Sequence, residues 1–426
     1  MEGAAGGRPA RPRGPRGPRR GVRAARPAGP RAPVRRPLTT QRSGAGTEGL
    51  RRANTAAVLR ALRRSGSSTR AELSQQTGLA KATVGAIVAE LEAVGAVAEE
   101  GSRPGVRGRP GRPVALRGEH FVALGLELNV DYVSAVAVDL AGEVRFSESR
   151  AGGGAADLLA LARTAQRELA DPGRTLVGIT VAVPALVRRD DRTVAWAPNL
   201  DLEGPGLADD LAAIAPGRPV RVSNDADCAA YAESHHGAAV GAAHALYLTG
   251  TVGIGAGILQ DGELVRGGAG FAGEVGHMPV GSSDAVCGCG RRGCWEASIG
   301  LQAMVRAVGV QELETPLRTG EAVAERARTD PAVRAALERV GHDVGLGIAT
   351  LSTVLDPEVV VLGGYFVPLG DLVLESARRT VDERLPSPEQ VRPELRLSTL
   401  GIEAAALGAA EQSFEPVLAG HRDLTA

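Results

Sequence analysis

The most informative segment of the chain, residues 274–296, reads EVGHMPVGSSDAVCGCGRRGCWE. Three of the four cysteines, Cys287, Cys289 and Cys294, lie within eight residues, and His277 lies ten residues before the first of them. Three thiolates and one imidazole form a ligand set that Zn²⁺ prefers in a tetrahedral site. Glycines between the cysteines allow so short a loop to fold around an ion. The segment predicts a structural zinc site, with a reduced cysteine-rich turn beside a histidine as the alternative.

Carboxylates and amides flank this loop and recur earlier in the chain. Ligands of open α/β sheets bind at the carboxyl ends of strands, and Asn224-Asp225 ends a predicted strand. Carboxylates accept hydrogen bonds from paired hydroxyls, and a zinc-bound histidine can donate from its second nitrogen. Each residue alone is also explained by a helix cap or a salt bridge, so the prediction of a neutral polyol site depends on the whole set. The set is Asn199, Asn224, Asp225, Glu274, His277 and Glu296.

The composition excludes several classes of protein. Four cysteines in 426 residues do not make a disulfide framework, and no run of about 18 apolar residues could span a membrane. The N-terminal segment lacks the apolar stretch of a secretory signal. We therefore expect a cytoplasmic protein of two or three domains. Its core must depend on aliphatic side chains, because aromatic residues make up only 3% of the chain.

Charge is distributed unevenly although the net charge is zero. Residues 1–120 carry 23 arginines and one lysine against eight acidic residues, a net charge of +16, and the remainder carries −16. A basic front end on an acidic body suggests a polyanion-binding segment. Residues 1–50 consist mainly of Arg, Pro, Gly and Ala, which predicts a disordered basic tail. The tail either adds nonspecific DNA affinity or is an incidental extension.

Residues 51–117 have the pattern of a winged helix-turn-helix. Apolar residues recur at helical spacing in two segments, and Thr69 with Glu72 forms a capping box that starts a helix between them. Two short predicted strands, 97–100 and 113–116, flank a basic loop. In such modules the third helix enters the major groove of DNA. A small helical domain that binds protein is the alternative.

Six residues of this module are the predicted DNA contacts. Lys81, the only lysine of the chain, and Thr83 point outward early in the third predicted helix. Guanidinium groups of the wing can contact phosphates or the minor groove. The wing arginines are Arg103, Arg107, Arg109 and Arg112. Operator DNA is therefore the expected macromolecular partner.

Strands and helices alternate from residue 120 to residue 412. Predicted strands at 122–128 and 175–183 are near-continuous apolar runs, and a helix is predicted over 155–170. Such alternation implies parallel or mixed sheets covered by helices. The remaining residues, 413–426, are predicted to form a C-terminal tail.

Over about residues 52–412 the chain resembles the ROK family, whose members are repressors, open reading frames and kinases. The most specific shared element is Glu274-x-x-His277, followed by Cys287-x-Cys289-x₄-Cys294-x-Glu296. The resemblance implies that His277 and the three cysteines bind structural zinc, and that the six residues of the polyol set contact a sugar. It implies an α/β fold of two actin-like lobes, of the sugar kinase and hexokinase type, around a cleft. The winged helix resembles the repressor branch, which includes xylose and N-acetylglucosamine repressors, and implies a homodimer or a dimer of dimers.

Two phosphate-binding loops of the kinase members are altered here. Kinase members carry Asp-x-Gly-Gly-Thr on the first hairpin, whereas residues 127–131 read ELNVD, without either glycine and with an acid in place of threonine. In the second loop Val252 replaces the phosphate-binding threonine. A phosphate cradle needs glycine for close backbone approach, and an added carboxylate repels ATP. Asp225 falls on the position of the kinase general base, but without a phosphoryl donor no catalytic residue is predicted.

Three functions are consistent with these features. The first is a sugar-responsive transcriptional regulator, a repressor that binds a pseudo-palindromic operator as a dimer and takes a sugar or sugar phosphate as its effector. The second is an active ATP-dependent sugar kinase with a DNA-binding head, and the third is a DNA-binding protein with a vestigial pocket. We favour the first, because the sugar side of the pattern is intact and the phosphate side is not. Differential affinity of the sugar for two states is sufficient to change DNA binding.

Overall fold

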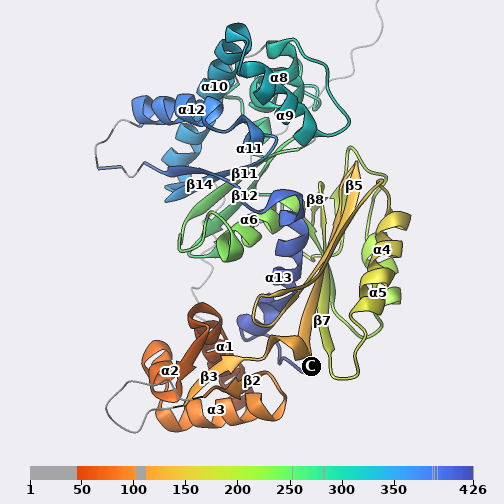
Figure 1. Ribbon diagram of the computed structural model, residues 1–426, viewed down its shortest axis with the longest axis vertical. Coiled ribbons are helices and arrows are strands. Elements are labelled where there is room, and N and C mark those ends of the chain that lie inside the picture. The colour runs from red at the N-terminus through yellow and green to blue at the C-terminus, as the bar shows by residue number, and fades with distance from the viewer. Residues whose placement is uncertain are drawn as a thin grey trace, which may run out of the picture. The chain divides into compact units, whose positions relative to one another are not determined.

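The computed structural model describes residues 46–101, 112–251, 253–281, 284–385, 387, 389–390 and 392–425. These residues belong to one compact unit, which contains a head of three helices and two α/β lobes (Figure 1). Among them, no helix combines the length and the apolar character that crossing a membrane requires. Nearly all of the predicted basic tail lies outside the described residues.

The head is a winged helix-turn-helix. Its elements are α1 (Thr47–Ser65), β1 (Ser67–Thr69), α2 (Arg70–Thr77), α3 (Lys81–Ala93), β2 (Val97–Glu99) and β3 (Pro113–Leu116). The predicted capping box is present: the Thr69 hydroxyl accepts from the Glu72 backbone N–H at 3.2 Å, and the Glu72 carboxylate accepts from the Thr69 N–H at 2.7 Å. The three strands form an antiparallel sheet in the order β1-β3-β2. Sequence patterns missed β1, because three residues are too few to show a period.

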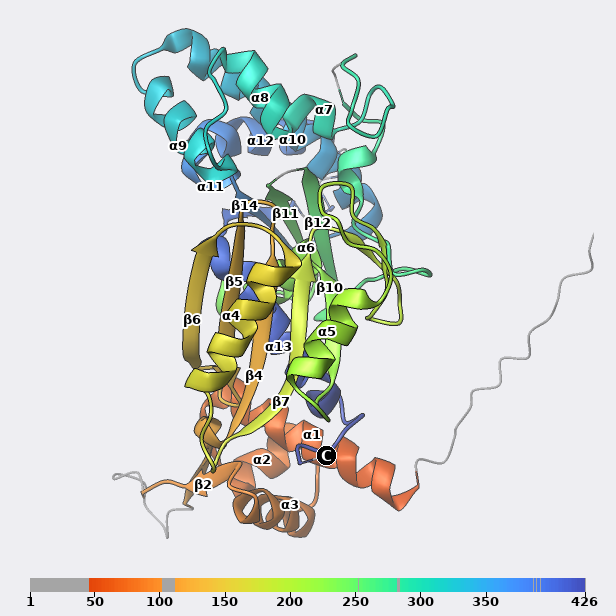
Figure 2. The same ribbon diagram turned by 90° about the vertical axis from the view of Figure 1, so that its right-hand side faces the viewer.

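The first lobe is built on a five-stranded sheet in the order β10-β7-β4-β5-β6. Its strands are β4 (Phe121–Leu128), β5 (Tyr132–Asp139), β6 (Val144–Ala151), β7 (Thr175–Val183) and β10 (Val220–Asn224). The first three in spatial order are parallel, and β5 and β6 are antiparallel to their neighbours. Figure 2 shows α4 (Ala155–Glu168) and α5 (Gly206–Ile214) on one face and α13 (Ala404–Leu418) on the other. A small hairpin of β8 (Leu186–Val187) and β9 (Val194–Trp196) extends from the lobe.

The second lobe repeats this strand pattern in the order β13-β12-β11-β14-β15. Its strands are β11 (Ala245–Gly250), β12 (Ile254–Gln260), β13 (Glu263–Leu264), β14 (Val359–Gly364) and β15 (Glu394–Leu397). Again an antiparallel meander is followed by two parallel strands. The other helices of the lobe are α7 (Glu296–Ile299), α8 (Leu301–Val308), α9 (Pro316–Ala327), α10 (Pro331–Leu355), α11 (Phe366–Leu369) and α12 (Asp371–Arg384). The repeat confirms the predicted two-lobed α/β fold.

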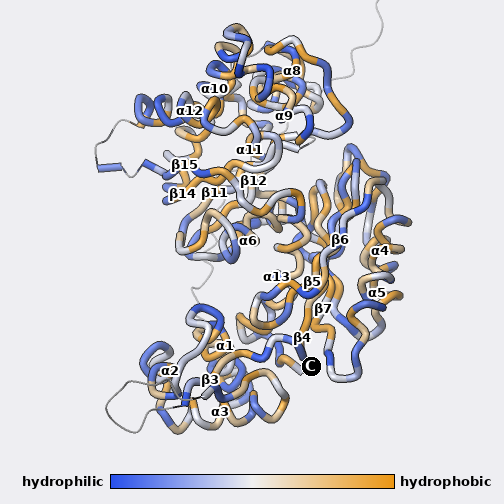
Figure 3. Tube along the Cα trace, in the orientation of Figure 1, coloured by the Kyte–Doolittle hydropathy of each residue, from blue (hydrophilic) through white to orange (hydrophobic). Residues whose placement is uncertain are grey.

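Helix α6 (Asp225–His236) joins the two lobes, because it follows β10 and packs on β11, β12 and α13. Short 3₁₀ turns complete the order of elements: η1 (Gly118–His120), η2 (Val275–His277) and η3 (Gly401–Glu403). Hydrophobic residues follow the central strands and the inner faces of the helices (Figure 3). One core extends from the head into the first lobe, since Leu59 and Leu62 of α1 belong to the same apolar cluster as Phe414 of α13.

Two predicted boundaries differ from the structure. Helix α1 begins at Thr47, inside the segment predicted as a disordered tail, and α13 continues to Leu418, inside the predicted C-terminal tail. Phe414 is fully buried against the head and the first lobe. Apolar packing against the head therefore accounts for the continuation of α13 beyond residue 412, and nothing in the sequence of that segment indicates this partner.

Candidate functional site

A cavity of about 460 Å³ opens where β10 ends and α6 begins. Residues of the cysteine-rich loop and of the start of β12 also line it. All six residues of the predicted polyol set belong to its lining: Asn199, Asn224, Asp225, Glu274, His277 and Glu296. The structure thus brings together side chains that are spread over almost a hundred positions of the sequence.

Asn224 and Asp225 lie at the carboxyl end of β10. The Asn224 side chain caps α6, because its Oδ1 accepts from the backbone N–H groups of Ala226 and Asp227 at 2.9 and 3.2 Å. Its Nδ2 donates to the carbonyl oxygen of Ala185 at 3.2 Å. The capping role that sequence left open for Asn224 is therefore present. Burial raises the pKa of Asp225 to about 6, and the neighbouring Glu274 adds to the effect.

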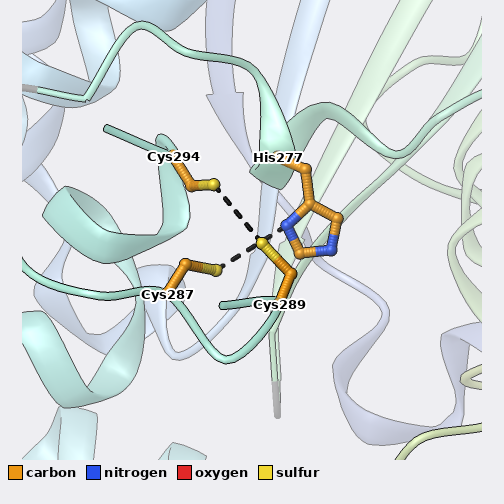
Figure 4. Close-up of side chains that lie close together, drawn as sticks. All are labelled: His277, Cys287, Cys289 and Cys294. Atoms are coloured by element: carbon orange, nitrogen blue, oxygen red, sulfur yellow. Dashed lines mark hydrogen bonds between the residues drawn. The ribbon is translucent and has the colours of Figure 1, made fainter. Parts of the chain in front are cut away.

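The four predicted metal ligands converge (Figure 4). Nδ1 of His277 and the three sulfurs all lie within 4.8 Å of one another. The Cys289 and Cys294 sulfurs are 3.6 Å apart, and the Cys287 sulfur is 3.7 Å from His277 Nδ1. A tetrahedron with zinc–sulfur bonds of roughly 2.3 Å has edges of about 3.8 Å. The described geometry therefore fits a metal ion of this coordination.

Local chemistry favours a thiolate at Cys289. Hydrogen bonds, first of all from the backbone N–H of Arg291, lower the pKa of Cys289 to about 6, whereas burial raises the pKa of Cys287. The thiolate is the form that binds a metal. Figure 4 also shows the second ring nitrogen of His277 directed away from the sulfurs. His277 also lines the cavity.

Glu296 connects the metal loop to β12. One carboxylate oxygen accepts from the backbone N–H of Ile254 at 3.1 Å, and the other lies 3.3 Å from the Cys287 sulfur. Glu274 precedes the turn η2, which carries His277. Burial raises the pKa of Glu274, and the nearby His277 opposes this shift only in part. Both carboxylates are thus held by the same loop that gathers the metal ligands.

The hairpin between β4 and β5 has a different character. Asn129 Oδ1 accepts from the backbone N–H of Val130 at 2.8 Å, and its Nδ2 donates to the Glu127 carboxylate at 3.3 Å. The Tyr132 hydroxyl donates to the same Glu127 oxygen at 2.7 Å. Glu127 is only 2% exposed, and burial raises its pKa to about 8. The polar groups of this hairpin therefore bond mainly to one another. Val252 of the second altered loop lies outside the described residues.

Several residues of the cavity lining were not predicted. Trp196 on β9 is 49% exposed, and Val286 of the metal loop is 58% exposed. Gln302 and Arg306 contribute from α8. Trp196 is one of two tryptophans in a chain poor in aromatic residues, and this rarity is the sequence feature that could have marked it as a functional residue. The α8 residues belong to no motif, so only the fold locates them.

The predicted DNA contacts are placed in part. Lys81 is the first residue of α3 and is exposed, and Thr83 is half-buried on the same first turn. Arg112 is exposed at the base of the wing, where its guanidinium lies 3.2 Å from the Glu99 carboxylate. Glu99 also accepts from Arg70 at 2.6 Å. The other three wing arginines, Arg103, Arg107 and Arg109, lie outside the described residues.

Comparison with known proteins follows this division of the chain. Residues 123–412, which are more than half of it, match the ROK family. The chain belongs to the ROK family. Residues 53–101 match the IclR helix-turn-helix domain, so this ROK chain carries its own helix-turn-helix head. The predicted family and fold are confirmed.

ROK relatives of two kinds resemble this chain. A xylose repressor of Caldicellulosiruptor bescii is 30% identical over 364 residues, 80% of this chain and 90% of the relative. A glucokinase of Streptomyces coelicolor is 30% identical over 262 residues, 57% of this chain and 82% of the relative. The crystal structure of a ROK family transcriptional regulator, a homologue of the E. coli Mlc protein, has a TM-score of 0.75. It covers 87% of this chain and 98% of its own at 23% identity, which shows a shared fold alone.

Proposed function

We propose that this protein is a DNA-binding transcriptional repressor of carbohydrate genes whose DNA affinity changes when a sugar occupies the cavity. One observation carries the proposal: a winged helix-turn-helix shares its apolar core with a lobe that contributes to a cavity lined with hydrogen-bonding groups. The repressor relatives match both regions of the chain, whereas the glucokinase relative matches 57% of it.

The cavity suits a sugar for chemical reasons. Asp225, Glu274 and Glu296 supply carboxylate oxygens, which accept hydrogen bonds from neighbouring hydroxyls. With Nδ1 on the metal, the second ring nitrogen of His277 carries the proton and can donate a hydrogen bond. The exposed face of Trp196 offers an apolar surface to the C–H groups of a sugar ring. We infer that the six predicted residues contact the effector. Asn224 also caps the N-terminus of α6.

The metal that we propose is zinc, held by His277, Cys287, Cys289 and Cys294. When bound, it supplies structural rigidity and neutralises thiolate charge. The residues of this chain do the recognition: the loop places His277 Nδ1 beside Cys287, and Glu296 bonds to the backbone of Ile254. Such outer contacts orient the groups that surround a metal.

We propose that no phosphoryl transfer occurs in this cavity. Phosphate binding at a hairpin depends on backbone N–H groups that are free to donate. Here the Val130 N–H already donates to Asn129, and a Cβ atom on Gly153 would lie 2.3 Å from the Val130 carbonyl oxygen, so the hairpin is packed against the following segment. Asp131 adds an exposed negative charge.

The DNA-binding head is expected to act in pairs. One winged helix reads a half-site, and two heads of a homodimer match a pseudo-palindromic operator. Lys81 at the start of α3 is placed to reach base edges or phosphates, and Arg112 belongs to the wing that contacts the backbone. The effector is then a free or phosphorylated sugar, and the regulated genes concern its metabolism.

The test is DNA binding to a duplex from the region upstream of the gene, measured by fluorescence anisotropy with and without D-xylose, D-glucose, N-acetylglucosamine and their phosphates. We expect at least one sugar to change the dissociation constant. If Lys81 contacts a base, Lys81→Ala should weaken operator binding by about 1–3 kcal/mol. If Lys81 contacts a phosphate, the substitution should weaken binding to all sequences alike and reduce its salt dependence. Unchanged affinity and unchanged salt dependence would remove α3 from the interface.

An active sugar kinase with a DNA-binding head is the second candidate. The glucokinase relative and the position of Asp225 in the cavity favour it. A general base near neutral pH is useful in catalysis, and burial raises the pKa of Asp225 to about 6. A coupled assay for ADP release in the presence of each sugar separates the two candidates.

A further inference from the structure

A buried ion pair joins the DNA-binding head to the first lobe. Glu411 of α13 is fully buried, and its carboxylate accepts two hydrogen bonds of 2.8 Å from the guanidinium of Arg63 on α1. The same guanidinium lies over the ring of Phe414, 5.7 Å from its centroid. Burial would raise the pKa of Glu411, but Arg63 and His236 outweigh it and lower the pKa to about 2. Glu411 is therefore a carboxylate at every physiological pH.

A third group completes this contact from another helix. His236 is the last residue of α6, and its Nε2 lies 2.7 Å from the Glu411 oxygen that also bonds to Arg63. Gly142, in the turn after β5, covers the three side chains: a Cβ atom there would be 3.3 Å from the Arg63 guanidinium and 3.4 Å from the His236 ring. Glu411 thus has a partner on the head and a partner on α6, and little room around it.

Helix α6 begins in the cavity and ends at this contact. Asp225 is its first residue and lines the cavity, and His236 lies eleven positions later. A helix rises about 1.5 Å per residue, so roughly 16 Å separate the two ends along its axis. A rigid helix carries a displacement of one end directly to the other.

Two glycine contacts hold α6 without intervening side chains. A Cβ atom on Gly408 of α13 would lie 1.7 Å from the carbonyl oxygen of Cys228, the fourth residue of α6. A Cβ atom on Gly257 of β12 would lie 2.4 Å from the carbonyl oxygen of Ala226, near its start. Backbone therefore meets backbone on both sides of α6. Side-chain rotamers cannot absorb a movement at these points, so a shift of α6 is taken up at its far end, where His236 meets Glu411 of α13 through side chains.

We propose that Glu411 is the residue through which the state of the cavity reaches the DNA-binding head. In this mechanism a ligand at Asp225 shifts α6, the shift changes the His236–Glu411 hydrogen bond, and the Glu411–Arg63 pair transfers the change to α1. Because the carboxylate is excluded from water, a lost partner cannot be replaced by solvent, and the contact favours a few discrete arrangements. This inference rests on the proposed function, since it requires that a sugar changes DNA binding. Glu411 and His236 are positioning residues and touch neither ligand.

The decisive variant is His236→Leu, which removes the link from α6 but leaves the Arg63–Glu411 pair intact. In the wild type, we expect saturating sugar to change the DNA dissociation constant by roughly 5- to 150-fold, the usual range of coupling. In His236→Leu we expect this ratio to fall below about 2, while sugar affinity and sugar-free DNA affinity each stay within about threefold of wild type. His236→Gln keeps an N–H donor and should restore part of the coupling.

A second variant tests the other half of the contact. The double substitution Arg63→Met and Glu411→Met replaces the buried pair with apolar side chains of similar length, a change that proteins tolerate far better than the loss of one partner. It should keep both separate affinities and lose the coupling. Thr180→Val is the matched control, because it removes a buried hydrogen bond of 2.7 Å to Ser413, which is also on α13 but outside the contact of Arg63, Glu411 and His236. Its coupling ratio should equal that of the wild type.

The measurements are sugar titration by calorimetry and anisotropy of the upstream duplex, with D-xylose, D-glucose and N-acetylglucosamine as probes. If the wild type responds to a sugar and folded His236→Leu responds equally, the inference is overturned while the proposed function stands. If Thr180→Val loses coupling as fully as His236→Leu, the role is general packing of α13, and the inference is also overturned. A wild type whose DNA affinity ignores every sugar overturns the proposed function, and this inference with it.

Discussion

The metal loop and the β4–β5 hairpin both lie near Asp225, yet they treat their polar groups in opposite ways. In the loop, His277, Glu274 and Glu296 present polar atoms to the cavity. In the hairpin, Asn129 and Tyr132 donate to Glu127, so that the polar groups bond within the hairpin. One edge lines the cavity, whereas at the other edge both donors bond to the same oxygen of Glu127. The difference supports our proposal that the cavity binds a sugar and that no phosphoryl transfer occurs there.

Loss of the metal should produce the largest effect on the edge formed by the metal loop. In Cys289→Ser we expect the metal content to fall from about one ion per chain to none, because hydroxyl is a poor substitute for thiolate. Sugar affinity should fall more than about a hundredfold, since ligand-orienting outer contacts are lost with the ion. Elemental analysis of chelator-free protein and calorimetry measure the two quantities.

Cys228→Ser is the control for this experiment, because Cys228 is buried on α6 and outside the metal cluster. It should retain the metal. Freshly purified wild type without zinc would contradict the assignment of the ion.

The second prediction concerns phosphoryl transfer. We expect the wild type to show no turnover of ATP with any sugar of the panel. Catalysis of this reaction depends on positioning and charge stabilisation, and kinases reach about 1–100 s⁻¹. The triple change Asn129→Gly, Val130→Gly and Asp131→Thr should open the hairpin without restoring turnover, because Val252 would still lack the hydroxyl of the second loop. A coupled ADP assay with the sugar panel is the measurement. Turnover of about 1–100 s⁻¹ by the wild type would contradict the proposal that no phosphoryl transfer occurs in this cavity.

Asp225 provides a smaller and sharper test of the cavity. Asp225→Asn keeps the shape of the side chain and removes a charged acceptor, which is worth about 1.5–3 kcal/mol in a hydrogen bond. We expect sugar affinity to fall by about 10- to 100-fold and the melting temperature to stay the same or rise, because a buried charge is lost. Asp210→Asn on the exposed side of α5 should change neither. Equal sugar affinity in Asp225→Asn would place the ligand elsewhere.

Glu127 gives the smallest effect and tests the β4–β5 hairpin. Burial raises its pKa to about 8, from about 4.5 in the unfolded chain, so its protonated form is stabilised by folding. This contribution is complete below pH 4.5 and is lost as the pH rises towards 8. Between pH 6 and pH 8 the free energy of unfolding of wild type should fall by about 2 kcal/mol relative to Glu127→Gln.

Urea unfolding at the two pH values measures this difference, with exposed Glu321→Gln on α9 as the control. Parallel behaviour of wild type and Glu127→Gln would mean that Glu127 is solvated or ionised in the fold, and that the hairpin is open.

Sequence patterns predicted which polar residues gather at the cavity and the cysteine-rich loop better than they predicted the contacts between the head and the first lobe. The side chains that converge at the cavity and at the cysteine-rich loop could be predicted because each is a residue type with a specific chemical preference; their roles as metal ligands and sugar contacts stay predictions. Most of the sheet followed from apolar runs such as 175–183, which matches β7 in both limits. The edge strand β6 was missed, because its alternating polar residues face solvent. The pair of Arg63 and Glu411 could not be predicted, because neither segment of the sequence indicates a partner more than three hundred residues away.

The position of α13 in the chain has a consequence for protein synthesis. The head is complete by about residue 117, but the surface on which it docks includes Phe414 and Val417. At roughly 5–20 residues per second, a ribosome needs about 15–60 seconds to make the intervening 290 or so residues. During that interval a nascent head has its recognition helix but no partner for the apolar face of α1. A chain that ends before α13 would therefore carry a head whose α1 lacks this apolar partner.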